Sequence, residues 1–206
     1  MQDLDKALAD ISAMRIQMAR GAEFRGYGPA TLAATGMLAL LAAVAQALWL
    51  PAPARDIGAY LALWLATAAI SAAIIYMEMV ARSRRVHSDL ADEMIHSAIT
   101  QFLPSAVAAT LLTVVLLRFA PECLWMLPGL WQIVFSLGVF AACRMLPRPM
   151  LAAGAWYLVT GLACLALARD AHAFSPWAMG LPFGLGQMFV AGVVRTCLQG
   201  EEADHG

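Results

Sequence analysis

Residues 30–50 read ATLAATGMLALLAAVAQALWL, a run of 21 residues without a charged side chain. An α-helix needs about 20 mostly apolar residues to cross the hydrocarbon core of a bilayer. This run is apolar nearly all round the helix, whereas a surface helix of a soluble protein carries one apolar stripe. The run therefore predicts a transmembrane helix.

Five further runs of the same kind follow, and short charged connections separate them. They cover residues 58–80, 97–118, 123–143, 149–168 and 176–195. Of the 206 residues, 62% are hydrophobic and 13% are charged, and that charged share is about half the share of a soluble domain. The sequence thus predicts an all-α integral membrane protein. We expect a bundle of six transmembrane helices within residues 29–196, surrounded by the lipid bilayer and without nucleic acid as a partner.

The positive charges are divided unevenly between the two sides of this predicted bundle. Lysine and arginine accumulate on the cytoplasmic side of membrane proteins, so their distribution gives the orientation. One side carries ten of them, Lys6, Arg15, Arg20, Arg25, Arg82, Arg84, Arg85, Arg144, Arg148 and Arg195, and the other carries three, Arg55, Arg118 and Arg169. We therefore expect both termini in the cytoplasm and the protein in the cytoplasmic (inner) membrane of a bacterium.

The two ends of the chain differ from the runs between them. Within residues 2–20, apolar side chains recur at steps of three and four, which indicates an amphipathic helix; they are Leu4, Leu8, Ile11, Met14 and Met18. Its polar face mixes both charge signs, unlike a basic membrane-surface helix. We therefore expect it to pack on a partner helix or on the bundle. We expect residues 1–28 to form this cytoplasmic helix and a break, and the acidic residues 197–206 to be disordered.

The fourth and sixth runs share a sequence pattern. Residues 127–139 and 181–193 each contain Leu-Pro, then Gly-Leu, then a glutamine, and later Gly-Val. Looser matches among the other runs suggest three parallel helical hairpins, formed by runs one and two, three and four, and five and six. Small residues on one helical face, such as Ala66, Ala69 and Ala73, favour a homo-oligomer.

Two glutamines lie near the middle of the matching runs, about one helical turn after a proline. A proline frees the backbone carbonyl four residues before it, and lipid tolerates this only where the carbonyl finds a partner or lines a cavity. Transporters place substrate where broken helices carry polar side chains at the midplane. The alternative is that the prolines shape packing and the glutamines bond between helices. We expect the two amides to face each other or a shared cavity, in a path lined by Gln132, Gln187, Pro128, Pro182, Gly184 and Gly186.

Acidic residues give two further candidate functional sites. Glu78 lies inside the second run, where an acid is a candidate for function, although it could instead reach water or pair with Arg82. Glu93 and His96 have the Glu-x-x-His spacing of di-metal helical bundles, and Asp92 could join them. The competing interpretation is a solvated helix start, whose acids complement the helix dipole. The four cysteines stand singly and no histidine pair lies inside a run, so no cofactor is predicted.

Three functions agree with these features. The first is a channel or transporter for a small polar solute or ion, with its site on the fourth and sixth runs. The second is a membrane-embedded interaction or regulatory protein that acts through residues 2–20. The third is an intramembrane enzyme, although the sequence offers no recognisable catalytic motif.

A topology reporter tests the predicted orientation. A reporter that is active only in the cytoplasm should work when it is fused after Arg85 and after Arg195, because both positions lie on the arginine-rich side. A reporter that is active only outside the cytoplasm should be silent at both positions. Activity of this second reporter at either position would reverse the orientation.

Overall fold

The computed structural model describes residues 28–86, 89–142, 150–168 and 172–204, which are helical apart from short connections. The helices are α2 (Pro29–Trp49), α3 (Ile57–Val86), α4 (Asp89–Phe119), the short 3-10 helix η1 (Pro121–Met126), α5 (Leu127–Ala142), α6 (Met150–Leu167) and α7 (Pro176–Asp204). The predicted all-α class is confirmed for these residues. The predicted helix at residues 2–20 lies outside them.

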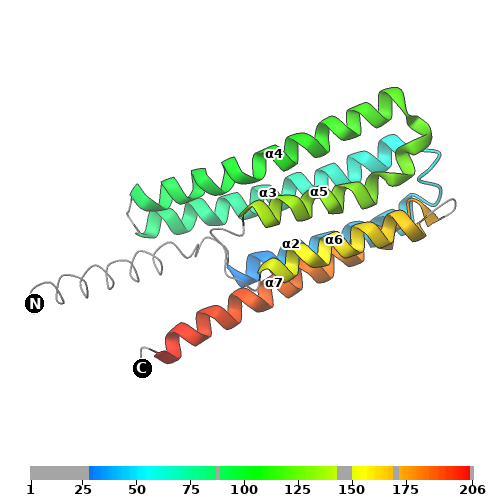
Figure 1. Ribbon diagram of the computed structural model, residues 1–206. Coiled ribbons are helices and arrows are strands. Elements are labelled where there is room, and N and C mark those ends of the chain that lie inside the picture. Colours follow the sequence, from blue (N-terminus) through cyan, green and yellow to red (C-terminus); the bar gives the residue numbers. More distant parts are fainter. Residues whose placement is uncertain (1–27, 87–88, 143–149, 169–171, 205–206) are drawn as a thin grey trace, which may run out of the picture.

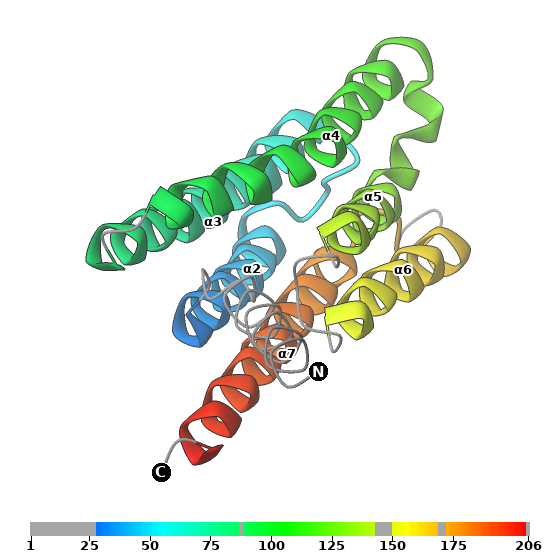
Figure 2. The same cartoon turned by 60° about the vertical axis from the view of Figure 1, so that its left-hand side comes forward.

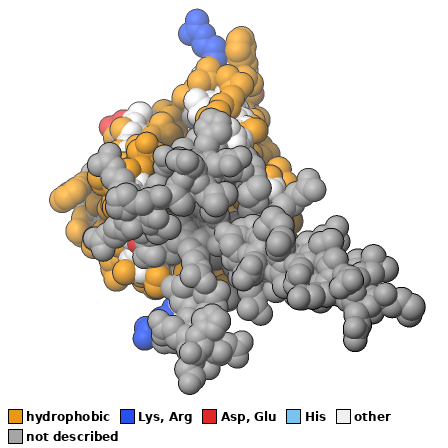
Figure 3. Space-filling view, turned by 90° about the vertical axis from the view of Figure 1, so that its left-hand side faces the viewer, with side chains coloured by type: hydrophobic (Ala, Val, Ile, Leu, Met, Phe, Trp, Pro, Cys, Tyr) orange, Lys and Arg blue, Asp and Glu red, His pale blue; other side chains and the backbone are white. Residues whose placement is uncertain are grey.

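Most of these helices have the length and composition of membrane spans. Five segments are long and apolar enough to cross a bilayer, Pro29–Trp49, Ile57–Ala81, Phe102–Phe119, Pro121–Ala142 and Pro176–Thr196, and the apolar segment of α6, Leu151–Leu167, is shorter. Large apolar side chains also point outward: Trp49, Phe119 and Leu167 are each more than three-quarters exposed. Hydrophobic side chains dominate the coloured part of the face in Figure 3. These features indicate a protein embedded in a membrane.

The helices follow one another around the bundle in chain order. Each packs antiparallel against the next, and α7 closes the bundle against α2 (Figure 1). Figure 2 shows α3 and α4 as an outer layer beside the other four helices. The start of α2 and the end of α7 lie at the same end of the bundle, and the connections between α2 and α3 and between α4 and α5 lie at the other end.

Glycines set the two closest interfaces between helices. A Cβ added at Gly36 of α2 would lie 2.9 Å from the carbonyl oxygen of Gly184 in α7, and one added at Gly129 of α5 would lie 2.8 Å from that of Gly161 in α6. Such contacts let helix backbones approach closely, as is common within membranes. Helix α4 contains no glycine, and it packs loosely on α3.

The last helix differs from its prediction in two ways. Pro182 and the glycines around it predict a bent or broken helix, but α7 continues as an α-helix through Pro182, so the helix is not broken there. It also runs on to Asp204, so residues 197–204 of the tail that was expected to be disordered are helical. No proline follows Pro182 in the chain, so the helix that begins in the apolar run can propagate into the acidic residues.

Adding a methyl group at Gly180 tests the α2–α7 interface. A Cβ at this position would overlap the Cβ of Ala43, so we expect Gly180→Ala to lower the free energy of unfolding by about 1–3 kcal/mol, as overpacking does. Gly192 of the same helix is the matched control, because an added Cβ there meets nothing within 4 Å. Unfolding by denaturing detergent measures both variants. Equal stability of the two would contradict the close packing at Gly180.

Candidate functional site

A hydrogen bond from Gln132 satisfies the backbone carbonyl that Pro182 frees. Because Pro182 lacks an N–H, the carbonyl of Ala178, four residues earlier, has no helical donor. The Nε2 atom of Gln132 donates to this oxygen at 2.9 Å, and to the carbonyl oxygen of Pro128 in its own helix at 3.0 Å. Helix α7 can therefore continue through the proline without leaving a polar group unpaired in the apolar interior.

The surrounding helices hold the Gln132 side chain in place. Gln132 is fully buried. A Cβ added at Gly161 of α6 would lie 3.1 Å from the Cβ of Gln132, so α6 covers the side chain directly. The two hydrogen bonds use both protons of its amide nitrogen. The Oε1 atom, in contrast, is buried and has no hydrogen-bond partner in the described part of the protein.

Tyr157 of α6 carries a second buried polar atom, where its side chain packs against α5 and α7. Its ring lies 4.7 Å from the ring of Phe135 and 5.2 Å from that of Phe183. Its hydroxyl points at Gly186, where an added Cβ would lie 2.5 Å from the oxygen. The residue is 1% exposed, and among the described residues its hydroxyl finds no hydrogen-bond partner.

Tyr60 of α3 is the third such residue. It is fully buried, and its ring packs edge-on against Phe174 at 5.0 Å. It belongs to the apolar core that also contains Leu127 and Met179. Its hydroxyl likewise has no hydrogen-bond partner within the described ranges.

These three residues, which we call the polar row, follow the inner side of α7. Tyr60 contacts Phe174 just before this helix, Gln132 reaches Ala178 in its first turn, and Tyr157 reaches Gly186 in its third turn. Ala178 and Gly186 are about 12 Å apart along an α-helix. Ser136, one turn after Gln132 in α5, is also fully buried and donates to the carbonyl of Ile133.

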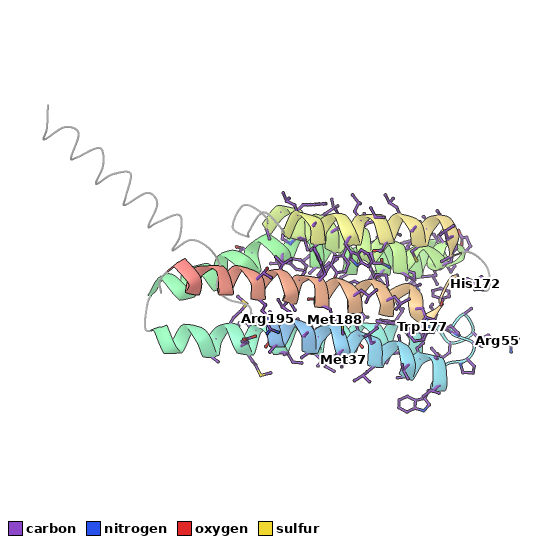
Figure 4. All side chains as sticks on the ribbon, turned by 90° about the horizontal axis from the view of Figure 1, so that it is seen from below. Met37, Arg55, His172, Trp177, Met188 and Arg195 are labelled. Carbon is purple, nitrogen blue, oxygen red and sulfur yellow. The ribbon has the colours of Figure 1, made fainter. Side chains whose placement is uncertain are left out.

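The buried polar side chains that the structure describes are all uncharged. Arg55, Arg118, Glu122 and Arg195 are exposed. Arg55 lies beyond one end of the helices, and Arg195 lies toward the other end, with Met37 and Met188 between them (Figure 4). A buried amide oxygen and two buried hydroxyls without partners each cost about 1–3 kcal/mol of stability. Such a row can bind a small polar molecule that supplies the missing hydrogen bonds.

The structure does not bring Gln187 to Gln132. Gln187 lies nine residues after Ala178, about two and a half helical turns, and therefore on the opposite side of α7. Its Cβ is 3.0 Å from a Cβ added at Gly36 of α2. Gly184 faces α2 as well, through Leu40. Pro128, Pro182 and Gly186 remain beside the row.

The acidic candidates lie elsewhere. Glu78 is half-buried on α3. Asp92, Glu93 and His96 fall in the helical backbone of α4, but their side chains lie outside those described. No group of three metal-binding side chains occurs in the part that the structure describes.

Sequence analysis missed a second buried glutamine. Gln46 of α2 donates through Nε2 to the carbonyl oxygen of Phe174 at 2.7 Å, and its Oε1 accepts from Nε1 of Trp64 in α3 at 2.7 Å. Both polar ends of its amide are therefore used by protein, which indicates a structural role. A polar residue within the apolar run of residues 30–50 was the available signal. Tyr60 and Tyr157 gave no signal, because their sequence positions fit ordinary apolar packing.

Comparisons of the chain with protein-family models, with curated proteins and with solved structures found no match.

Proposed function

We propose that this protein is a channel or transporter for a small polar solute, which passes or binds along the polar row of Tyr60, Gln132 and Tyr157. The observation that carries the proposal is that each residue of the polar row buries one polar atom that has no hydrogen-bond partner among the described residues. In the apolar interior of a membrane protein, polar groups are expensive and mark substrate pathways. The proposed site thus combines α5 and α7, as the sequence suggested, with α6 and α3.

The sequence left two alternatives open for Gln132, a solute path and hydrogen bonding between helices. The nitrogen and the oxygen of its amide bear on them differently. Its nitrogen donates one hydrogen bond within α5, to Pro128, and one to Ala178 of α7, and the second is the bond expected of an amide that stabilises helix packing. Its oxygen is buried and has no hydrogen-bond partner among the described residues, which is what supports a binding role for the amide. Gln187 is not part of the proposed path, since it lies on the α2 side of α7.

The same proposal includes six membrane crossings, both termini in the cytoplasm and three parallel hairpins. Two tryptophans support equivalence of the first two hairpins. Trp64 donates to Gln46, and Trp131 donates to Oγ1 of Thr113 at 2.9 Å, each from the second helix of a hairpin to a residue 18 positions earlier in the first. In the third hairpin, Trp156 donates to the carbonyl oxygen of Pro182, which is a different pairing.

A membrane-embedded interaction protein is the second candidate. It is favoured by the outer layer of α3 and α4, in which only 22% and 6% of the apolar segments are buried inside the molecule. These faces meet either lipid or another protein. If the protein is an interaction protein, water and solutes do not reach the polar row, and the protein acts through a partner or a second copy.

Access of water to Ser136 distinguishes the two candidates. We expect Ser136→Cys, made in protein that lacks its four native cysteines, to react with a small uncharged methanethiosulfonate added from water. Ser136 lies on α5 one turn after Gln132, and cysteine matches serine in shape. Reaction is followed by mass spectrometry of the folded protein in proteoliposomes.

Thr35→Cys is the matched control for this experiment. Like Ser136, Thr35 is buried and its hydroxyl donates to a backbone carbonyl of its own helix. Thr35 lies on α2, which contributes no residue to the polar row, so cysteine at this position should stay protected. Protection of both cysteines in folded protein would contradict the proposed transport function and favour the interaction protein. Reaction at Ser136→Cys alone supports the path.

A further inference from the structure

We infer that the solute of the polar row is an uncharged molecule that carries N–H or O–H groups, such as urea or water, rather than an ion. This inference rests on the proposed function and names its substrate class. It follows from the hydrogen-bonding capacity of the three side chains, from the charges around them, and from the rings that surround them.

Gln132 sets the first requirement on the solute. Both protons of its nitrogen are already donated to the carbonyl oxygens of Pro128 and Ala178. Only its Oε1 atom is available, and an amide oxygen accepts hydrogen bonds but cannot donate them. A solute at this position must therefore carry a donor. Urea and water do, whereas a halide or a deprotonated carboxylate does not.

The two tyrosines accept the same class of molecule. A phenolic hydroxyl both donates and accepts one hydrogen bond, so each of the Tyr60 and Tyr157 hydroxyls can serve a solute that carries both kinds of group. The rings of Phe135 and Phe183 close the space around Tyr157. Both rings are apolar, so in this immediate surrounding the Tyr157 hydroxyl is the group that can hydrogen-bond a small neutral molecule.

The lack of a neutralising charge argues against an ion. A bare charge in an apolar interior is expensive unless an opposite charge or several polar ligands surround it. Among the described residues, no side chain that is buried as a whole carries a carboxylate, ammonium or guanidinium group. One carboxylate oxygen, Oε2 of the half-buried Glu78, is also buried, but Glu78 follows Tyr60 by 18 residues on α3, about 27 Å along the helix. Filters that conduct cations present rings of carbonyl oxygens, but the row presents one amide oxygen and two hydroxyls.

Flux into proteoliposomes separates the two solute classes. Urea entry is measured by stopped-flow light scattering, and potassium entry by a potential-sensitive dye under an imposed potassium gradient. We expect the wild-type protein to raise urea permeability at least tenfold over protein-free liposomes and to leave the dye signal unchanged. Potassium flux would overturn this inference while leaving the proposed function intact. Absence of both fluxes would overturn the proposed function, and this inference with it.

Tyr157→Phe tests the role of the row itself. The substitution keeps the ring and its contacts and removes only the hydroxyl. We expect the protein-dependent urea permeability to fall about threefold to tenfold, the change that corresponds to one neutral hydrogen bond. We expect thermal stability to stay equal or to rise, because the hydroxyl has no partner in the described structure.

Tyr76→Phe is the matched control. Tyr76 is half-exposed on α3, so removal of its hydroxyl should leave urea permeability at the wild-type level. Equal permeability of Tyr157→Phe and wild type would overturn the assignment of the solute to the row. Loss of permeability together with loss of stability in Tyr157→Phe would also overturn it, because the hydroxyl would then act in folding.

Discussion

The hydrogen bond from Gln132 to the carbonyl oxygen of Ala178 is the interaction on which the rest of the bundle depends. Pro182 removes one backbone donor from α7, and an unpaired carbonyl in lipid or in an apolar core would favour a break in the helix. The side chain of α5 replaces the missing donor, so no carbonyl is left unpaired at Pro182 where α7 continues from Pro176 to Asp204. A continuous α7 can then pack along α2, where Gly180 and Gly184 bring the two helices close together.

The side-chain hydrogen bonds and the glycines have complementary effects. Indole N–H groups link the two helices of every hairpin, through Trp64, Trp131 and Trp156. Glycines bring neighbouring hairpins together, at the α5–α6 and α7–α2 interfaces. Association of helices in lipid relies on such close contacts and on interhelical hydrogen bonds, because there is little hydrophobic gain between helices. The α3–α4 interface lacks comparable glycines, which explains why these two helices form the most exposed layer.

The helical architecture could be predicted from the sequence, but the geometry of the site could be predicted only in part. Uninterrupted apolar runs indicate where helices form, so each described α-helix contains one of these runs or most of it. Helices α3, α4 and α7 also extend into charged sequence beyond their runs. Pro182 and Gln132 were visible as residues that need a partner. The position of Gln187 was misleading, because a shared pattern with Gln132 does not say which neighbour each helix face meets. Gln187 meets Gly36 of α2 instead. Whether the hydroxyls of Tyr60 and Tyr157 have partners is a property of tertiary packing, and no local pattern encodes it.

The two buried tyrosine hydroxyls lower the stability of the protein, because they have no hydrogen-bond partner among the described residues. Phenylalanine at either position would keep the ring contacts with Phe174 or with Phe135 and Phe183, and it would bury no unpaired hydroxyl. A buried polar group without a partner lowers stability by about 1–3 kcal/mol, a large share of the total for a small protein. Gln132 differs, because its nitrogen repairs the carbonyl that Pro182 frees and the cost of its oxygen is partly offset. The hydroxyls have no such compensation within the described protein, and packing alone gives no physical reason for tyrosine rather than phenylalanine at these two positions; binding of the proposed solute would give one.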